Sequence, residues 1–311
     1  MKTQFGMLAK WSLPIFVATV LSVPASATAS DTIKFTFAPG GNISFVQRLT
    51  TNKETDMGDK GTQLDESISV TNIAIAKTAS GWDVLAAPQS ISMRRNGQEI
   101  TSPIVKLLSS SPVTYKLDPE GNILDVDGYE PFIEGISRQV GPEVFKQLEP
   151  ILNIDAMKAK EIAEWNGRIG DYLGAEAQVG DSFVAEVPYE LPNGASITYV
   201  VRTTIADSVP CGIHKCVRIE QHYDSNADAI AGQASEVLSG LTKDATPAQE
   251  QSDPTSGTAT VRGKVSRVVD PTTMLVYEEE SSRTIEMEIN IPGAGLTPAK
   301  TTETRKYEFV Y

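Results

Sequence analysis

The chain has 311 residues, with 27 basic against 40 acidic side chains and a formal net charge of −13. This excess of negative charge argues against binding to nucleic acid and against adhesion to anionic lipid surfaces, because both require clustered lysine and arginine. The length suits one large β-rich domain or two small ones.

The first 27 residues have the three parts of an export signal. Lys2 and Lys10 form a basic start, residues 11–23 form a mostly apolar core, and Ala25-Ser26-Ala27 is a small-residue cleavage site. The core is shorter than the roughly 20 residues that a membrane span requires. We therefore expect cleavage at this site, a mature chain of residues 28–311 that is periplasmic or secreted, and no stable membrane insertion. The mature chain would carry 25 basic and 40 acidic residues, a net charge of −15.

Alternation of apolar and polar side chains is the main pattern after residue 30. It predicts strands with one buried and one solvated face, as in antiparallel sheets. Examples are Phe35–Phe37, Ile197–Ile205, Val261–Val265, Ile285–Ile289 and Tyr307–Tyr311. The alternation slips by one residue between Asn72 and Ile73, which predicts a bulge in that strand.

The middle of the chain has a different pattern. Residues 129–174 are rich in helix formers, with apolar residues at helical spacing. Gly141-Pro142 divides the first part into two expected helices, and Asn153 or Asp155 can cap a third. A further helix is expected at 228–242, followed by a flexible polar loop at 243–257. The fold class is therefore α+β: a large curved, half-barrel-like antiparallel sheet with helices packed on its concave side.

A weak internal repeat suggests a duplicated architecture. Residues 115–124 and 266–275 each resemble a strand, an Asp-Pro turn and a second strand. This predicts two pseudo-repeats, 28–128 and 175–311, joined by the helical segment 129–174. The alternative is a single β-rich domain over 28–311 without duplication, because Asp-Pro is a common turn former.

Cys211 and Cys216 are the only cysteines, and they flank a turn between two expected strands. Cysteines at such a place can reach the Cα separation that a disulfide requires, and exported proteins form disulfides. The alternative is a metal site, because Cys211, His214, Cys216 and His222 offer two sulfur and two nitrogen ligands. Their spacing is not that of a standard zinc site, so the disulfide is preferred, and we expect no metal and no other cofactor.

Motifs of catalysis and nucleotide binding are absent from the sequence. We find no G-x-S-x-G, S-x-x-K, H-E-x-x-H, P-loop or G-x-G-x-x-G. The acidic residues at 118–130 could suggest calcium, but the EF-hand spacing fails there. Asp181, Glu186 and Glu190 could suggest acid–base chemistry, but such groups are common. No catalytic residue is assigned, and whether the chain is an enzyme stays open because active sites assemble in space.

Two motifs carry a resemblance to a known family. The hairpin TYKLDPEGNILDVDG at 114–128 and VGDSF at 179–183 resemble a group of bacterial exported proteins of unknown function. That group is similar to the periplasmic lipid and lipoprotein carriers of the LolA/LppX type. The resemblance implies a curved antiparallel sheet covered by helices, with a lipid or lipoprotein as partner. Its motifs are turns and strands, so it assigns no ligand-binding residue.

Three hypotheses for the function follow. The leading one is non-enzymatic binding of an apolar ligand or an acylated partner between the sheet and the helices, which an internal cavity would favour. The second is an envelope interaction or assembly module with a filled core, which an exposed apolar patch would favour. The third is a hydrolase with an unrecognised site.

Overall fold

The computed structural model describes residues 32–56, 58, 61–101, 105, 107, 109–140, 142, 145, 152–190, 196–225, 259–291 and 295–311. The expected export signal at 1–27, the expected helix at 228–242 and the expected loop at 243–257 lie outside the described residues. These three features stay predictions.

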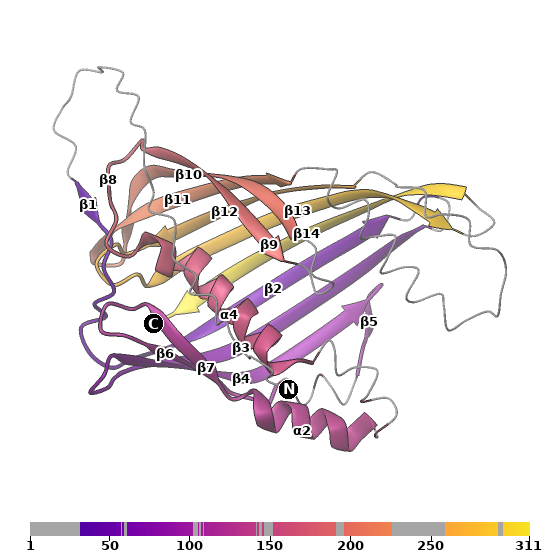
Figure 1. The fold of residues 1–311 in the computed structure, drawn as a ribbon, viewed down its shortest axis with the longest axis horizontal. Helices are drawn as coiled ribbons and strands as arrows, with labels where there is room; N and C mark the ends of the chain where they lie inside the picture. Colours follow the sequence, from indigo (N-terminus) through magenta and orange to yellow (C-terminus); the bar gives the residue numbers. More distant parts are fainter. Residues whose placement is uncertain are drawn as a thin grey trace, which may run out of the picture. The chain divides into compact units, whose positions relative to one another are not determined.

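Twelve strands form one antiparallel sheet. They are β2 (Ile43–Asp56), β3 (Thr62–Lys77), β4 (Trp82–Arg95), β5 (Gln98–Glu99), β6 (Val113–Leu117), β7 (Ile123–Asp127), β9 (Ser182–Glu190), β10 (Ser196–Cys211), β11 (His214–Ser225), β12 (Ala259–Val269), β13 (Val276–Ile291) and β14 (Gly295–Val310). The order is β7-β6-β4-β3-β2-β14-β13-β12-β11-β10-β9, with β5 paired to β4. The sheet is not closed, and Figure 1 shows that it curves.

The early and late strands belong to the same sheet because β2 pairs along its length with β14. A separate two-stranded sheet joins β1 (Ile33–Lys34) to β8 (Glu176–Ala177). The predicted large antiparallel sheet is confirmed. The division into two pseudo-repeats stays a prediction.

Among the described residues of the expected helical segment are two α-helices and a short 3₁₀ helix. They are α2 (Tyr129–Val140), α4 (Ile154–Arg168) and η2 (Gly170–Tyr172). The Asn153 side chain caps α4 by accepting hydrogen bonds from the backbone N–H groups of Asp155 and Ala156, at 2.8 and 3.2 Å. None of the described helices is long and apolar enough to cross a membrane.

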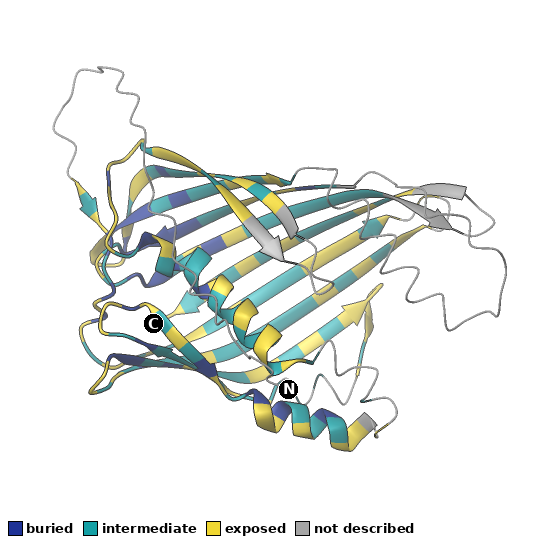
Figure 2. Ribbon diagram, viewed as in Figure 1, coloured by how far each residue is buried: buried dark blue, intermediate teal, exposed yellow. Residues whose placement is uncertain are grey.

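Helix α4 covers one face of the sheet, which we call the inner face (Figure 1). Trp165 anchors the helix: its indole N–H donates to the carbonyl of Gly121 at 3.1 Å, and its ring meets Phe37 edge-on at 5.9 Å between centroids. The predicted packing of a helix on the concave side is therefore observed. Buried residues gather toward one end of the strands, as Figure 2 shows, and include Ile75, Val84 and Ile219.

The bulge expected in β3 is not there. Residues of β3 pair with β2 in unbroken register, from Ile43 opposite Ile75 to Asp56 opposite Thr62. The irregularity lies on β4, where Val70 faces Ser90 but Thr71 faces Pro88, which leaves Gln89 as the extra residue. The slip in alternation instead reflects a change of polarity on the inner face of β3. Its side chains there change from isoleucine at 73 and 75 to the hydroxyl-bearing Thr71, Ser69 and Ser67.

Candidate functional site: a groove between the sheet and α4

A cavity of about 530 Å³ lies between the inner face and α4, and we call it the groove. Strands β2, β3, β4, β6 and β11 to β14 form its floor and walls, and α4 contributes Glu161, Glu164 and Arg168. Because successive side chains of a strand point to opposite faces, the lining residues of β2, β3, β4 and β6 are spaced two apart. The groove has two chemically distinct halves.

The apolar half lies mainly over strands of the N-terminal part of the chain, and β13, β14 and the turn before β13 complete it. One row of side chains crosses four adjacent strands in register: Phe45 of β2, Ile73 of β3, Ala86 of β4 and Val113 of β6. Further apolar lining residues are Leu49, Ile75, Val84, Pro88, Met274, Leu275, Val276 and Phe309. Aliphatic rows on adjacent strands thus make a continuous apolar surface.

The charged half lies over β12, β13 and β14 and contains two groups of three charges. In the first, which we call the inner triad, Glu279 accepts hydrogen bonds from Nε of Arg267 at 2.8 Å and from Nη2 of Arg168 at 3.0 Å. Arg267 also donates to the carbonyl oxygens of Gly167 and Arg168 at 3.4 and 3.2 Å. Both Arg267 and Glu279 are buried, with side chains 6% and 7% exposed. The inner triad therefore ties the end of α4 to the sheet.

The second group, the outer triad, is more accessible. Glu303 of β14 accepts hydrogen bonds from Nη2 of Arg283 at 2.8 Å and from Nε of Arg305 at 2.5 Å. Glu303 is 11% exposed, whereas the side chains of Arg283 and Arg305 are 42% and 40% exposed. In both triads one carboxylate meets two guanidinium groups, so each triad has an excess of one positive charge.

The arginines hold both carboxylates in the ionised form. Burial alone would raise the pKa of Glu279, but the charges of Arg168 and Arg267 outweigh it and bring the pKa to about 2. Burial also opposes ionisation of Glu303, and Arg305 and Arg283 again place its pKa below the usual value. A carboxylate that stays ionised is a poor proton donor, so neither group is suited to general acid catalysis at neutral pH.

Two carboxylates of α4 also line the groove. Glu161 accepts a hydrogen bond from the hydroxyl of Tyr115 at 2.6 Å. Burial, and then the charge of Glu161, raise the pKa of Tyr115 well above its usual value, so this tyrosine remains a hydrogen-bond donor. Glu164 is 56% exposed and lies 3.7 Å from Lys160.

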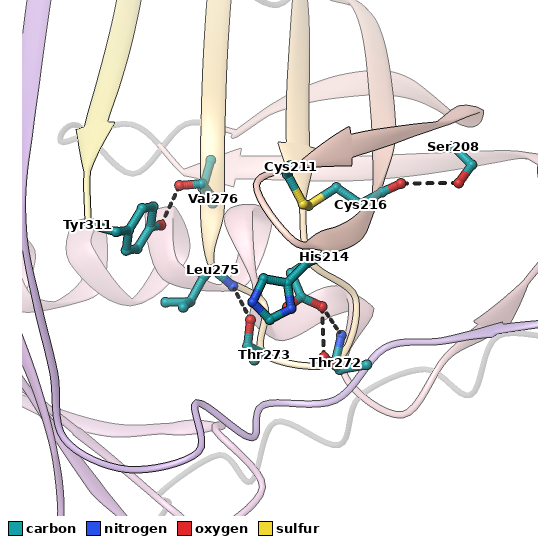
Figure 3. The surroundings of a disulfide bond; sticks show 10 residues. Ser208, Cys211, His214, Cys216, Thr272, Thr273, Leu275, Val276 and Tyr311 are labelled. Carbon is teal, nitrogen blue, oxygen red and sulfur yellow. Dashed lines mark hydrogen bonds and ion pairs between the residues drawn. A yellow bond between two sulfur atoms is a disulfide. The ribbon is translucent and has the colours of Figure 1, made fainter.

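The predicted disulfide is present at the tip of the β10–β11 hairpin, outside the groove. Cys211 and Cys216 are bonded with a Cα separation of 5.7 Å, as Figure 3 shows. The side chain of His214 points toward the β12–β13 turn, where its Nδ1 lies 3.5 Å from Oδ2 of Asp270.

The four residues of the alternative metal site do not converge. His222 lies opposite Arg202 and Lys264, six residues along β11 from Cys216, which is about 20 Å at the rise of a strand. Across the described part of the chain, no group of three or more His, Cys, Asp or Glu side chains is arranged to hold a metal ion.

Three of the acidic residues that the sequence singled out, Asp118, Asp125 and Asp181, stabilise turns or the packing of α4. Asp118 accepts hydrogen bonds from the backbone N–H groups of Glu120 and Asn122 and so stabilises the β6–β7 turn. Asp125 pairs with Lys158 of α4 at 3.0 Å. Asp181 accepts from the backbone N–H of Gln178 at 2.7 Å, in the turn before β9.

Replacing both cysteines by serine is expected to lower the free energy of unfolding by about 2 kcal/mol, at the low end for disulfides because the closed loop is short. Urea denaturation of the double variant, followed by tryptophan fluorescence, measures the loss. The circular dichroism spectrum without urea should be unchanged, because the bridge lies outside the groove and closes only the tip of one hairpin. A changed spectrum would show that the fold itself requires the bridge.

No family model matches the chain, and no curated protein matches it. Solved structures show remote similarity. Lipovitellin, in a structure concerned with its lipid–protein interactions, is 8% identical over 87% of this chain, with a TM-score of 0.43, and the chain spans about a quarter (25%) of the lipovitellin chain.

Two further structures are similar at still lower scores. An exported protein with a YmcC-like fold from Bacteroides fragilis is 12% identical, with 86% and 97% of the two chains covered and a TM-score of 0.23. DynF from the dynemicin biosynthesis pathway of Micromonospora chersina is 7% identical, with 96% and 92% covered and a TM-score of 0.21. These similarities define no family, so the resemblance to the LolA/LppX-type carriers stays a prediction.

Proposed function

We propose that this protein binds a lipid, or the acyl chain of a lipoprotein, in the groove, and that it does so outside the cytoplasm without catalysing a reaction. The apolar half of the groove carries the proposal. Aliphatic and aromatic side chains of β2, β3, β4, β6, β13 and β14 line a space that α4 covers and does not fill. The volume of the whole groove, about 530 Å³, is within the range of about 300–1,000 Å³ that is common for ligand pockets.

The physical basis of such binding is the burial of apolar surface. Each methylene group removed from water contributes about 0.8 kcal/mol, so a long acyl chain supplies affinity without many directed contacts. The groove fits this mode because its apolar rows are continuous across β2, β3 and β4.

Two features support action outside the cytoplasm. The sequence begins with the pattern of an export signal, and the chain holds a disulfide between Cys211 and Cys216. Disulfides persist in oxidising compartments and are rare in the cytoplasm. The absence of a catalytic motif, together with the pairing of Glu279 and Glu303 with arginine, favours a binding protein over a hydrolase.

Native mass spectrometry of the mature protein, purified without detergent, tests the proposal. We expect a species heavier than the polypeptide by the mass of a lipid, which organic extraction removes. A bare mass, combined with no uptake of oleate or monoolein by the extracted protein, would contradict lipid binding.

Removal of the ligand should also lower the stability of the fold. A ligand that binds only the folded state, present at 100 times its dissociation constant, adds about 2.7 kcal/mol to the free energy of unfolding. Extracted protein should therefore unfold at lower urea concentration than loaded protein, and added oleate should restore the midpoint. Equal midpoints under saturating oleate would show that oleate does not bind the folded state preferentially.

One observation favours the alternative of an interaction module. Strand β9 is at the edge of the sheet order, and its Phe183, Val184 and Val187 are 45%, 55% and 44% exposed. Apolar edge strands can pair with a strand of another chain. Loss of self-association on changing Val184 to Lys, measured by analytical ultracentrifugation, would support that function.

A further inference from the structure

Arginine side chains cluster in the groove, although the chain as a whole is negatively charged. The net charge of the protein is −13, yet four arginines line the groove: Arg168, Arg267, Arg283 and Arg305. Four glutamates also line the groove, Glu161, Glu164, Glu279 and Glu303, so the lining as a whole carries no net charge.

The charges are unevenly placed: at the outer end Arg283 and Arg305 share the single carboxylate of Glu303, and Lys53 lies directly opposite Glu303 in the β2–β14 register. Asp65, opposite Lys53 in the β2–β3 register, is paired with Arg95. The outer end of the charged half is therefore locally positive.

The two triads differ in what remains available to a ligand. Arg267 of the inner triad is 6% exposed and donates to a carboxylate and two carbonyl oxygens, so its hydrogen bonds go to groups of the protein itself. Arg283 and Arg305 of the outer triad are each about two-fifths exposed and bond Glu303 through one nitrogen each. Among the described residues, Glu303 is the sole carboxylate that they bond. A guanidinium group has five N–H donors, so most of theirs remain for an anion.

The polarity of the inner face changes progressively between the two halves. Along β3 the side chains run from Ile75 and Ile73 to the hydroxyl groups of Thr71, Ser69 and Ser67. Along β2, Phe45 of the apolar half is six residues from Thr51, which lies directly opposite Arg305. Six residues of strand span about 20 Å, the order of length of an extended long acyl chain. The lining of the groove thus runs in one direction from an apolar end, past Thr71 and Ser281, to the end that carries Arg283 and Arg305.

We propose that the ligand of the groove is an anionic amphiphile, with its acyl chain in the apolar half and its carboxylate or phosphate against Arg283 and Arg305. This inference rests on the proposed function and adds the class of the head group. Arginine suits this task because its planar fork binds both oxygens of a carboxylate or phosphate and remains charged at any physiological pH.

Binding of three lipids with the same chain tests the head group: oleate, oleoyl lysophosphatidic acid and neutral monoolein, measured with extracted protein by competition against a fluorescent fatty acid. Inorganic phosphate is the fourth competitor. We expect one or both anionic lipids to bind at least tenfold more tightly than monoolein, and inorganic phosphate not to compete at millimolar concentration. Competition by phosphate alone would show a site for the free ion and contradict the amphiphile.

Variants of Arg283 and Arg305 test whether these residues cause the preference for anionic lipids. Arg283→Gln with Arg305→Gln should abolish the preference for the anionic lipids and leave monoolein binding unchanged, which also shows that the groove is intact. A triple variant that adds Glu303→Gln should behave in the same way, and it avoids leaving a carboxylate unpaired. The matched control is Arg262→Gln, because Arg262 is on β12 but on the opposite face, where it pairs with Glu286 at 3.0 Å.

The outcomes separate the inference from the proposed function. Equal affinity for all three lipids, or a preference that survives in the triple variant, overturns the head-group site and leaves lipid binding standing. Failure of every lipid to bind the wild-type protein contradicts the proposed function itself.

Discussion

Changing Glu279 to Gln is expected to lower the free energy of unfolding by about 3–5 kcal/mol, the usual cost of removing one partner from a buried ion pair. The reason is that Arg267 is 6% exposed and its guanidinium lies beside that of Arg168, with Glu279 as the carboxylate between them. Glutamine keeps the shape and one acceptor oxygen but removes the charge. Urea denaturation monitored by circular dichroism measures the loss.

The matched control is Glu308→Gln. Glu308 is on β14, but its side chain is 51% exposed and lies 4.0 Å from Nε of Arg48. Exposed pairs of this kind contribute about 0–1 kcal/mol, so the control should differ little from wild type. A loss for Glu279→Gln no larger than that of the control would show that water screens the inner triad.

The pH dependence follows from the same carboxylate. Its pKa is about 2 in the folded protein, below the usual value of 4.5 that we take for the unfolded chain. A lowered pKa stabilises the fold fully above the unfolded value, and this contribution is lost as the pH falls from about 4.5 toward 2. The Glu279→Gln variant should lack that part of the decline in stability with acid, so its curve and that of wild type should converge at low pH.

Alternation in the sequence was sufficient to predict the strands and their antiparallel arrangement, because one-sided burial imposes a period of two. The start of α4 was also predictable, since Asn153 is a good N-cap residue followed by a helical pattern. The slip in β3 does not mark a bulge in that strand, because the extra residue lies on β4. Ile68 and Val70 simply lie on the other face from Ile73, and the slip marks the end of the apolar half of the groove.

The triads could not be predicted in the same way, because they depend on long-range register. Arg168 and Glu279 are 111 residues apart in the chain, and their pairing requires α4 to end over β13. A local signal did exist for the outer triad: Glu303 and Arg305 are two residues apart on one face of β14. Without the register that places Arg283 opposite Glu303, that pair is indistinguishable from a solvated strand face.

A tryptophan placed in the apolar half tests whether oleate binds in the groove or elsewhere on the protein. Ala86→Trp is expected to weaken oleate binding at least tenfold, because Ala86 lies between Ile73 and Val113 in the row that lines the groove. The tryptophan would occupy space that is free of side chains, so the cost to stability should not exceed the about 1–3 kcal/mol of an overpacked core. Titration of extracted protein with oleate measures the affinity.

Leu85→Trp is the matched control, because Leu85 is the preceding residue of β4, points to the opposite face and is 39% exposed. The same side chain placed there should leave oleate affinity unchanged. Weak binding by Ala86→Trp alone assigns the ligand to the groove, since both variants place the same side chain on the same strand, at adjacent residues that point to opposite faces. Wild-type affinity in both variants would place the oleate outside the groove, and equal weakening in both would point to a general effect on β4.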